Sequence, residues 1–181
     1  MVPAILILSL AWTLKAMTDS LEAQAFVSGL IEGSAQNFKN FLPAVIFVIA
    51  CFLSFATGTS WGTFGILIPI CIAVFPGASD PLRIISMSAC MAGSVCGDHC
   101  SPISDTTIMA SAGSQCNHVN HVSTQLPYAI SVAVISFLTY IVAGFTQGLG
   151  IVTSGIISWI FGVIVLITFL FIMKKKFADK N

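Results

Sequence analysis

The chain has 181 residues, of which 56% are hydrophobic and 8% are charged, and its seven basic and seven acidic side chains balance. A soluble domain carries about 25% charged residues, so this composition and a mean hydropathy of +0.97 exclude a soluble enzyme, a disordered tail and a nucleic-acid-binding protein. We therefore expect an all-α polytopic membrane protein with a single transmembrane domain over residues 1–181.

The first hydrophobic run covers residues 1–17 and predicts a helix that just spans a bilayer. It has no basic segment at its start and no evident cleavage site, so we interpret it as a retained helix rather than a signal peptide. Residues 18–40 are the most polar stretch of the chain. Their apolar side chains recur at helical spacing, which predicts an interfacial segment.

Residues 41–76 form a hydrophobic stretch that is interrupted at 57–63. The arms on either side, 41–56 and 63–76, would be about 24 and 21 Å long at about 1.5 Å per residue. The hydrocarbon core is about 30 Å thick, so neither arm crosses it comfortably. We predict a re-entrant helical hairpin whose tip, with Trp61, is covered by protein or lines a water-filled cavity.

Residues 84–112 predict a broken transmembrane helix, because an apolar arm runs into a polar segment and a second short arm follows. Gly97 and Pro102 should interrupt the helix. The two arms and the break together can cross the membrane once. Two interrupted hydrophobic segments in one membrane protein are typical of a transporter binding site.

The remainder of the chain predicts a polar loop at 113–125 and two uninterrupted spans at 126–147 and 151–173. Residues 174–181 form a tail whose basic side chains are Lys174, Lys175, Lys176 and Lys180. Basic residues beside a span favour the cytoplasmic side. We therefore expect a multi-pass protein of a bacterial cell membrane with a cytoplasmic C-terminus.

Two carboxylates, Asp98 and Asp105, lie in the break where the chain should be at membrane depth. Each costs about 2.5–3.5 kcal/mol at a helix centre on insertion scales. Hard cations prefer carboxylate, hydroxyl and carbonyl oxygens. A carboxylate that holds either a proton or a cation is the minimum device for exchange. We therefore take both aspartates as candidate cation-binding residues.

Hydroxyl side chains surround both interruptions and would complete a cation shell: Ser101, Ser104 and Thr106 in the break, and Thr59 and Ser60 at the hairpin tip. Freed carbonyls near Pro102 would add oxygens. The structural alternative is that the aspartates cap broken helix ends or lie in an exposed loop, with Ser104 or Asp105 as an N-cap. The hairpin tip alternatively is a flexible glycine turn. Capping and ion binding are compatible.

Other chemistries fit the sequence less well. Cys96, His99 and Cys100 lack the paired Cys-x2-Cys spacing of a zinc site, and the six cysteines are interpreted as small apolar residues in helices. A Ser101–His99–Asp105 triad would crowd one short segment without a Gly-x-Ser-x-Gly elbow. His118 and His121 predict a solvated loop, or alternatively a sensor of cytoplasmic pH. We predict no cofactor and no enzymatic activity.

The run Gly97-Asp98-His99-Cys100-Ser101-Pro102-Ile103-Ser104-Asp105-Thr106-Thr107 resembles the signature of the NhaC-type Na+/H+ antiporter family. The stretch from Ala56 to Gly65 resembles a second segment typical of that family, and Leu10-Ala11-Trp12 resembles part of another of its helices. The resemblance implies an ion-transporter-type bundle with a re-entrant helical hairpin and a broken transmembrane helix. It also implies that this chain corresponds to the C-terminal portion of the family.

The resemblance implies a secondary transporter with cation-coupled exchange. Our hypothesis is that Na+ and H+ compete for Asp98 and Asp105, so that Asp105→Asn should abolish ion dependence. Its expected partners are the lipid bilayer, Na+, H+ and either a missing N-terminal half or further copies of the chain, without nucleic acid. An exchanger of organic acids or amino acids driven by Na+ or H+ is the nearest alternative. A non-transporting fragment of a split antiporter is the second.

Overall fold

The computed structural model describes residues 36–75 and 77–178, and the six isolated residues Ser9, Thr13, Ala16, Met17, Ser20 and Leu21. Regular secondary structure in the two described ranges is entirely helical, which confirms the all-α class. The elements are α3 (Gln36–Thr57), α4 (Ser60–Val74), α5 (Pro81–Cys100), α6 (Asp105–Gly113), α7 (His118–Thr146), the short 3-10 helix η1 (Gln147–Leu149) and α8 (Ile151–Ala178). Apart from these isolated residues, the helix predicted over residues 1–17 lies outside the described residues, and so does most of the interfacial segment predicted over 18–40.

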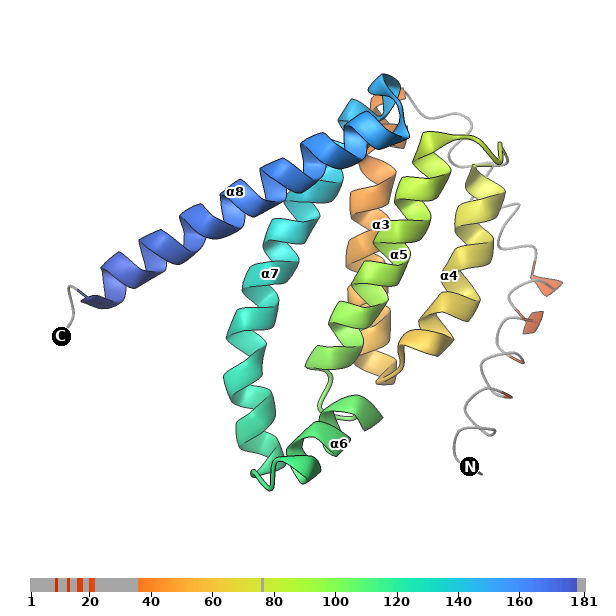
Figure 1. The fold of residues 1–181 in the computed structure, drawn as a ribbon. Helices are drawn as coiled ribbons and strands as arrows, with labels where there is room; N and C mark the ends of the chain where they lie inside the picture. The colour runs from red at the N-terminus through yellow and green to blue at the C-terminus, as the bar shows by residue number, and fades with distance from the viewer. Residues whose placement is uncertain are drawn as a thin grey trace.

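Helices α3 and α4 form an antiparallel hairpin (Figure 1). The first arm is longer than predicted, because α3 begins at Gln36 and has 22 residues. It contains a segment, Phe38–Thr57, that is long and apolar enough to cross a membrane. The expectation that neither arm is long enough is therefore wrong for α3. Helix α4 has 15 residues, about 22 Å at about 1.5 Å per residue, and the re-entrant arrangement stays a prediction.

Helix α5 lies at the centre of the bundle and packs against α3, α4 and α7 (Figure 1). Its contact with α3 is close because small residues face it. A Cβ atom added to Gly93 would lie 2.9 Å from Ala50 Cβ, and one added to Gly97 would lie 2.8 Å from the Phe55 backbone nitrogen. A small residue repeated at every fourth position lets two membrane helices approach closely.

The break after α5 lies later in the chain than predicted. Helix α5 continues through Gly97 and ends at Cys100, so the expectation that Gly97 interrupts the helix is wrong. The chain is extended at Ser101, as expected for a residue that precedes a proline. Helix α6 does not continue along the axis of α5 but turns across the lower end of the bundle (Figure 1).

Helix α7 returns along the bundle and begins at His118, so residues 118–125 are helical rather than part of a loop. Helix α8 is joined to it by η1 and diverges from it (Figure 1). The two helices contact each other near the turn, where Ser154 Oγ donates to the Ala143 carbonyl at 3.0 Å. Helix α8 continues five residues into the predicted tail, to Ala178.

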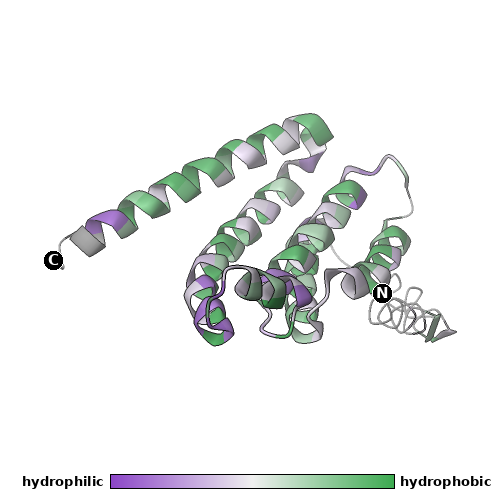
Figure 2. Cartoon of the chain, turned by 60° about the horizontal axis from the view of Figure 1, so that its bottom comes forward, coloured by the Kyte–Doolittle hydropathy of each residue, from purple (hydrophilic) through white to green (hydrophobic). Residues whose placement is uncertain are grey.

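The buried apolar core lies between α3, α4 and α5. It consists of Leu42, Ile46, Ala50, Leu67, Cys71, Phe75, Leu82 and Cys90. Within the described ranges, three segments are long and apolar enough to cross a membrane: Phe38–Thr57, His118–Leu149 and Ile151–Lys175. Most side chains on the last are exposed, and they are largely apolar along the helix (Figure 2). A long apolar exposed helix is suited to lipid or to further helices.

Candidate functional site

The break between α5 and α6 spans Ser101 to Ser104 and is fixed by local chemistry. Pro102 has no backbone N–H and cannot continue the α5 hydrogen-bond pattern. Ser104 begins the next helix, since its side chain accepts a hydrogen bond from the Thr106 backbone nitrogen at 3.2 Å. The interpretation of Ser104 as an N-cap is therefore confirmed.

Asp98 lies in the last turn of α5 and is 5% exposed. Ser104 Oγ donates a hydrogen bond to its Oδ1 at 2.6 Å and lies 2.7 Å from the Thr106 hydroxyl. No lysine or arginine occurs in the sequence between Arg83, near the opposite end of α5, and Lys174. The buried carboxylate thus accepts a hydrogen bond from Ser104, which Thr106 contacts in turn, and no lysine or arginine lies near it along the chain.

The second aspartate has a different environment. Asp105 lies in the first turn of α6 and is exposed. A carboxylate in this position stabilises a helix by its interaction with the positive end of the helix dipole, typically by about 0.3–1 kcal/mol. The structure therefore brings Ser104 to Asp98 and Thr106 to Ser104, while Asp105 is exposed on the described bundle.

Ser101 is fully buried at the start of the break. Its Oγ accepts a hydrogen bond from the Ile103 backbone nitrogen at 3.4 Å, and its carbonyl accepts one from the Ser104 nitrogen at 3.3 Å. These bonds close a compact turn that carries the Ser104 hydroxyl onto Asp98. Ser101 is thus a structural part of the break whose side-chain oxygen retains further acceptor capacity.

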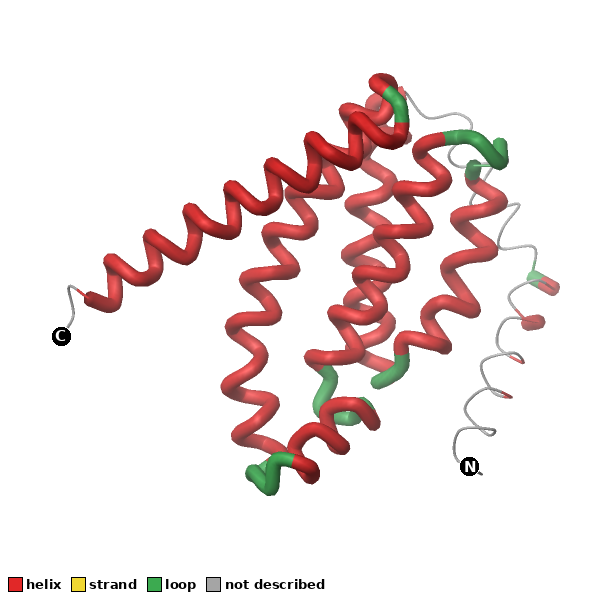
Figure 3. The backbone as a smooth tube through the Cα atoms, in the orientation of Figure 1, coloured by secondary structure: helices red, strands yellow, loops and turns green. Residues whose placement is uncertain are grey.

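The tip of the α3–α4 hairpin lies at the same end of the bundle as the α5–α6 break (Figure 3). Gly58 adopts a positive φ of 66°, and a Cβ atom there would lie 2.8 Å from the Ile103 side chain and 3.1 Å from its backbone. The two interruptions therefore meet through Gly58 and Ile103. The tip is a structured turn in which glycine is required both by its backbone conformation and by this contact.

The hydroxyl residues at the hairpin tip are placed beside the break but hydrogen-bond within the hairpin. Thr59 is the N-cap residue of α4, and its carbonyl accepts hydrogen bonds from Thr63 Oγ1 at 3.1 Å and from Thr57 Oγ1 at 3.5 Å. Ser60 is the first residue of α4 and is 9% exposed. Trp61 is 70% exposed and packs edge-on against Phe64, with ring centroids 5.9 Å apart.

The carbonyls around the break have side-chain donors rather than being free as expected. The His99 carbonyl accepts from Thr107 Oγ1 and from Gln125 Nε2, both at 3.1 Å. The Pro102 carbonyl lies 2.7 Å from His118 Nε2. Carbonyls at a helix end have lost their intrahelical partners and need others when they are buried. Helices α6 and α7 supply the donors.

His118 and Gln125 are contacts that sequence reasoning missed. His118 was predicted in a solvated loop, but it is the first residue of α7 and contacts both the break and α6. Gln125 lies two turns further along the same helix. Their polarity at the start of a long apolar span was the available signal, and hydrophilic residues do gather at this end of the bundle (Figure 2).

The described residues are not arranged as a zinc site or as a Ser101–His99–Asp105 triad would require. His99 Nδ1 lies 2.9 Å from the Val95 carbonyl on its own helix, and Ser101 Oγ pairs with the Ile103 backbone. The six cysteines are free thiols. Across residues 36–75 and 77–178, histidine, cysteine and acidic side chains nowhere gather in threes as a metal site would require.

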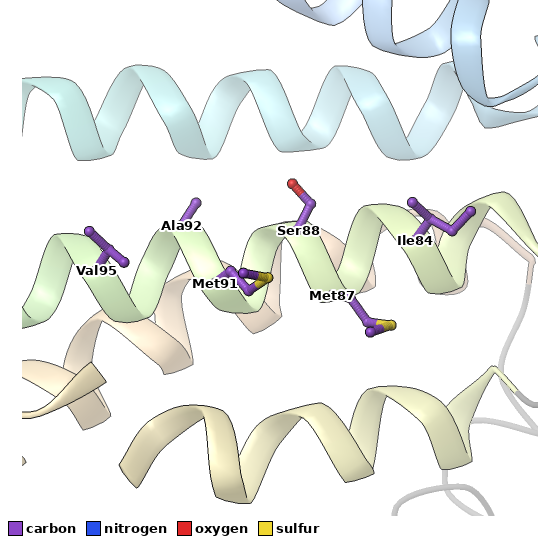
Figure 4. A pocket seen from close by; sticks show the side chains of 6 residues that line it. All are labelled: Ile84, Met87, Ser88, Met91, Ala92 and Val95. Atoms are coloured by element: carbon purple, nitrogen blue, oxygen red, sulfur yellow. The ribbon is translucent and has the colours of Figure 1, made fainter. Parts of the chain in front are cut away.

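Two apolar hollows adjoin α5. One, of about 580 Å³, lies between α3, α5 and α7, and its wall includes Cys51, Cys96, Gly97 and Cys100. The other, of about 670 Å³, is a groove along the opposite part of α5 (Figure 4). Its single hydroxyl, on Ser88, points toward α7 and lies 3.1 Å from the Tyr140 hydroxyl. Neither hollow offers the oxygen ligands of a cation site, so the polar break stands out as the candidate site.

Comparison with known proteins gives matches along the chain. A sequence model described as "Na+/H+ antiporter family" matches residues 1–145. An uncharacterized protein of Haemophilus influenzae is 44% identical over 173 residues, which are 96% of this chain and 32% of that protein. A malate-2H+/Na+-lactate antiporter of Bacillus subtilis is 38% identical over 101 residues, 56% of this chain and 21% of that protein.

An arginine/ornithine antiporter of Halobacterium salinarum is 38% identical over 106 residues, 56% of this chain and 22% of that protein. No solved structure matches the chain. The chain spans about a third or less of the length of these three relatives.

The family match covers the candidate site and all the helices that contribute to it. It agrees with the resemblance carried by the segments at 56–65 and 97–107, and the long apolar helices are those of an integral membrane protein. The chain belongs to the Na+/H+ antiporter family.

Proposed function

We propose that this chain forms the cation-binding part of a secondary active Na+/H+ antiporter, in which Na+ and H+ compete for Asp98. The observation that carries the proposal is the buried Asp98 carboxylate, which receives the Ser104 hydroxyl at 2.6 Å where two interrupted helices meet. An ionisable residue inside a membrane segment is costly, so its presence favours a functional role.

The surrounding oxygens support binding of a hard cation. Ser104 already contacts Asp98 through its hydroxyl, and the Thr106 hydroxyl lies next to it, 2.7 Å from Ser104 Oγ. Ser101 supplies a third oxygen from the turn. Thr59 and Ser60, at the hairpin tip beside the break, complete the shell from the other side when the hairpin moves. Hard cations such as Na+ and Mg2+ prefer oxygen ligands of this kind over sulfur or nitrogen ligands.

The two aspartates receive different roles because they differ in burial. Asp98 is the exchange carboxylate, since a buried charge without a counterion is favoured only when a proton or a cation neutralises it. Asp105 is exposed on the first turn of α6, where a carboxylate attracts cations toward the break. Binding of Na+ expels the proton from Asp98, and protonation expels Na+, so the two ions move in opposite directions.

Collapse of a pH gradient by Na+ in everted membrane vesicles tests this proposal. Asp98→Asn keeps the shape of the side chain and an acceptor for Ser104 but removes the charge, and we expect it to abolish the response. Asp105→Asn should leave a response with weaker Na+ dependence. Asp80→Asn is the matched control, because Asp80 caps α5 at its other end and asparagine is an equally good N-cap. A full Na+ response in Asp98→Asn would refute the assignment.

The relatives favour a second candidate, an exchanger of organic acids or amino acids coupled to Na+ or H+. One relative is named a malate-2H+/Na+-lactate antiporter and another an arginine/ornithine antiporter. Under this alternative the same carboxylate binds the coupling ion and the organic substrate binds elsewhere. Na+ flux that appears only when malate, lactate, arginine or ornithine is added would distinguish it from simple Na+/H+ exchange.

A third candidate is a subunit or fragment that does not transport alone. This candidate is supported by the match to the Haemophilus influenzae protein that is 44% identical, because the matched residues make up only 32% of that protein's length. An in-frame coding stretch immediately upstream, or activity that appears only when an N-terminal portion is co-expressed, would support it. In all three cases we infer a bacterial cell membrane. We place the C-terminus in the cytoplasm, because Lys174, Lys175 and Lys176 follow the apolar part of α8 directly.

A further inference from the structure

His118 connects three parts of the chain that meet at the candidate site. It is the first residue of α7, and its ring nitrogens have different partners. Nε2 lies 2.7 Å from the Pro102 carbonyl in the break, and Nδ1 lies 3.0 Å from Ser111 Oγ on α6. One side chain therefore ties the α5–α6 break to both following helices.

The chemistry of the partners fixes the proton on one ring nitrogen. A carbonyl oxygen only accepts hydrogen bonds, so Nε2 must carry a hydrogen and donate it to Pro102. Nδ1 has two options, because Ser111 Oγ is also 2.9 Å from the Ile108 carbonyl. The serine donates either to Nδ1 or to Ile108. The bond to Pro102 is the same in both arrangements, so it requires a donor at the Nε2 position and not a charge.

The Pro102 carbonyl belongs to the turn that presents Ser104 to Asp98. The proline ring fixes its own φ, and the neighbouring Ser101 holds the Ile103 and Ser104 backbone nitrogens. Holding the Pro102 carbonyl from outside removes the remaining freedom of this peptide group. The orientation of the turn then determines whether the Ser104 hydroxyl reaches the carboxylate.

We propose that His118 is a positioning residue for the cation site: its Nε2–H bond to the Pro102 carbonyl holds the Ser101–Ser104 turn so that Ser104 stays hydrogen-bonded to Asp98. This inference rests on the proposed function for its effect on Na+ binding. Its effect on the turn itself is independent of transport. The two effects are therefore measured separately.

The test compares side chains that differ in whether they carry a donor that reaches Pro102. His118→Gln places a neutral amide donor at a length similar to Nε2. His118→Met has the same length without a donor, and His118→Asn has a donor one methylene shorter. His121→Gln is the control: it makes the same histidine-to-glutamine change one turn further along α7. Each variant is inserted in membranes and checked for yield before measurement.

The first readout is hydrogen exchange at the Ile103 and Ser104 amides, measured by mass spectrometry. We expect His118→Met and His118→Asn to accelerate exchange about three- to tenfold, the effect of losing one hydrogen bond. His118→Gln and His121→Gln should stay within about twofold of the parent chain. Unchanged exchange in both His118→Met and His118→Asn would overturn the proposal. Exchange in His118→Gln that is as fast as in His118→Met would overturn it too.

The second readout is the apparent KM for Na+ in the vesicle assay, with Asp98→Asn alongside. We expect the Met and Asn variants to raise the KM by about three- to tenfold at a similar maximal rate, with rescue by Gln. If Asp98→Asn retains a full Na+ response, the proposed function fails while the exchange readout still decides the role of His118. If Asp98→Asn abolishes the response but the KM is unchanged in Met and Asn, the positioning role is refuted and the proposed function stands.

Discussion

Replacing Gly97 with alanine should force α3 and α5 apart. A Cβ atom at this position would lie 2.8 Å from the Phe55 nitrogen, against an ordinary contact of 3.4–4 Å, and closer still to the Cys51 carbonyl oxygen. Both neighbours are backbone atoms, so no side chain can rotate out of the way. Relief needs the helix axes to separate at the point of closest packing, one residue before Asp98.

The energetic consequence follows from two opposing terms. Overpacking a buried site typically costs about 1–3 kcal/mol, and a clash with two backbone groups of α3 belongs at the upper end. Alanine gains about 1 kcal/mol over glycine in helix propensity. We therefore expect Gly97→Ala to destabilise the protein by about 2 kcal/mol. The matched control is Gly65→Ala in α4, where nothing lies within 4 Å of the added Cβ and only the favourable term remains.

The assay is thermal unfolding of both variants in the same detergent, followed by loss of helical circular dichroism. The two variants should differ by about 3 kcal/mol, or about 6–12 °C in Tm at the sensitivity of chains of this size. Gly97→Ala should also weaken Na+ dependence, because Asp98 moves with α5. If Gly97→Ala were as stable as Gly65→Ala, the close α3–α5 contact would be refuted.

Two further substitutions test the hairpin tip and the packing of α3. Gly58→Ala should destabilise the protein by about 1–2 kcal/mol, the usual cost of a left-handed non-glycine residue, and unchanged thermal stability would contradict the Gly58–Ile103 contact. Ser54→Ala removes the buried hydroxyl that donates to the Ser94 carbonyl at 2.6 Å, and it should lower the unfolding free energy by about 1 kcal/mol. Thr168→Ala is the control: it removes an exposed hydroxyl bonded to its own helix and should change the unfolding free energy little.

The membrane class and the helical interruptions were predictable from local sequence. Long apolar runs with few charges indicate segments that lie in lipid. There every backbone polar group must be paired within the protein, which favours helices. Ser104 was predictable as an N-cap because serine before a short helical arm satisfies its free backbone N–H groups. Pro102 was predictable as the end of α5 for the converse reason.

The role of Gly97 was missed when its local sequence was read alone. Glycine is a frequent helix breaker, but here α5 continues through it because the missing side chain makes room for the α3 backbone. Gly93 and Gly97 are spaced four residues apart, and this spacing was the signal for close packing. The start of α3 at Gln36 was also missed, since polar side chains in a first turn lower the hydropathy of a helix without ending it.

The long-range part of the site also required the structure. His118 lies sixteen residues after Pro102, and Gln125 lies twenty-six after His99. No periodicity relates these positions, because a turn and a change of helix direction separate them. The burial difference between Asp98 and Asp105 likewise depends on how α6 turns away from α5.

Proton release on Na+ binding tests whether the two ions compete for Asp98. The purified protein is titrated with NaCl by calorimetry in buffers of different ionisation enthalpy at constant ionic strength, which counts protons without requiring transport. Competition predicts that Na+ binding releases protons and that Asp98→Asn eliminates both the binding heat and the release, while Asp80→Asn retains them. Na+ binding of unchanged affinity in Asp98→Asn, or binding without proton release at any pH, would contradict exchange at this carboxylate.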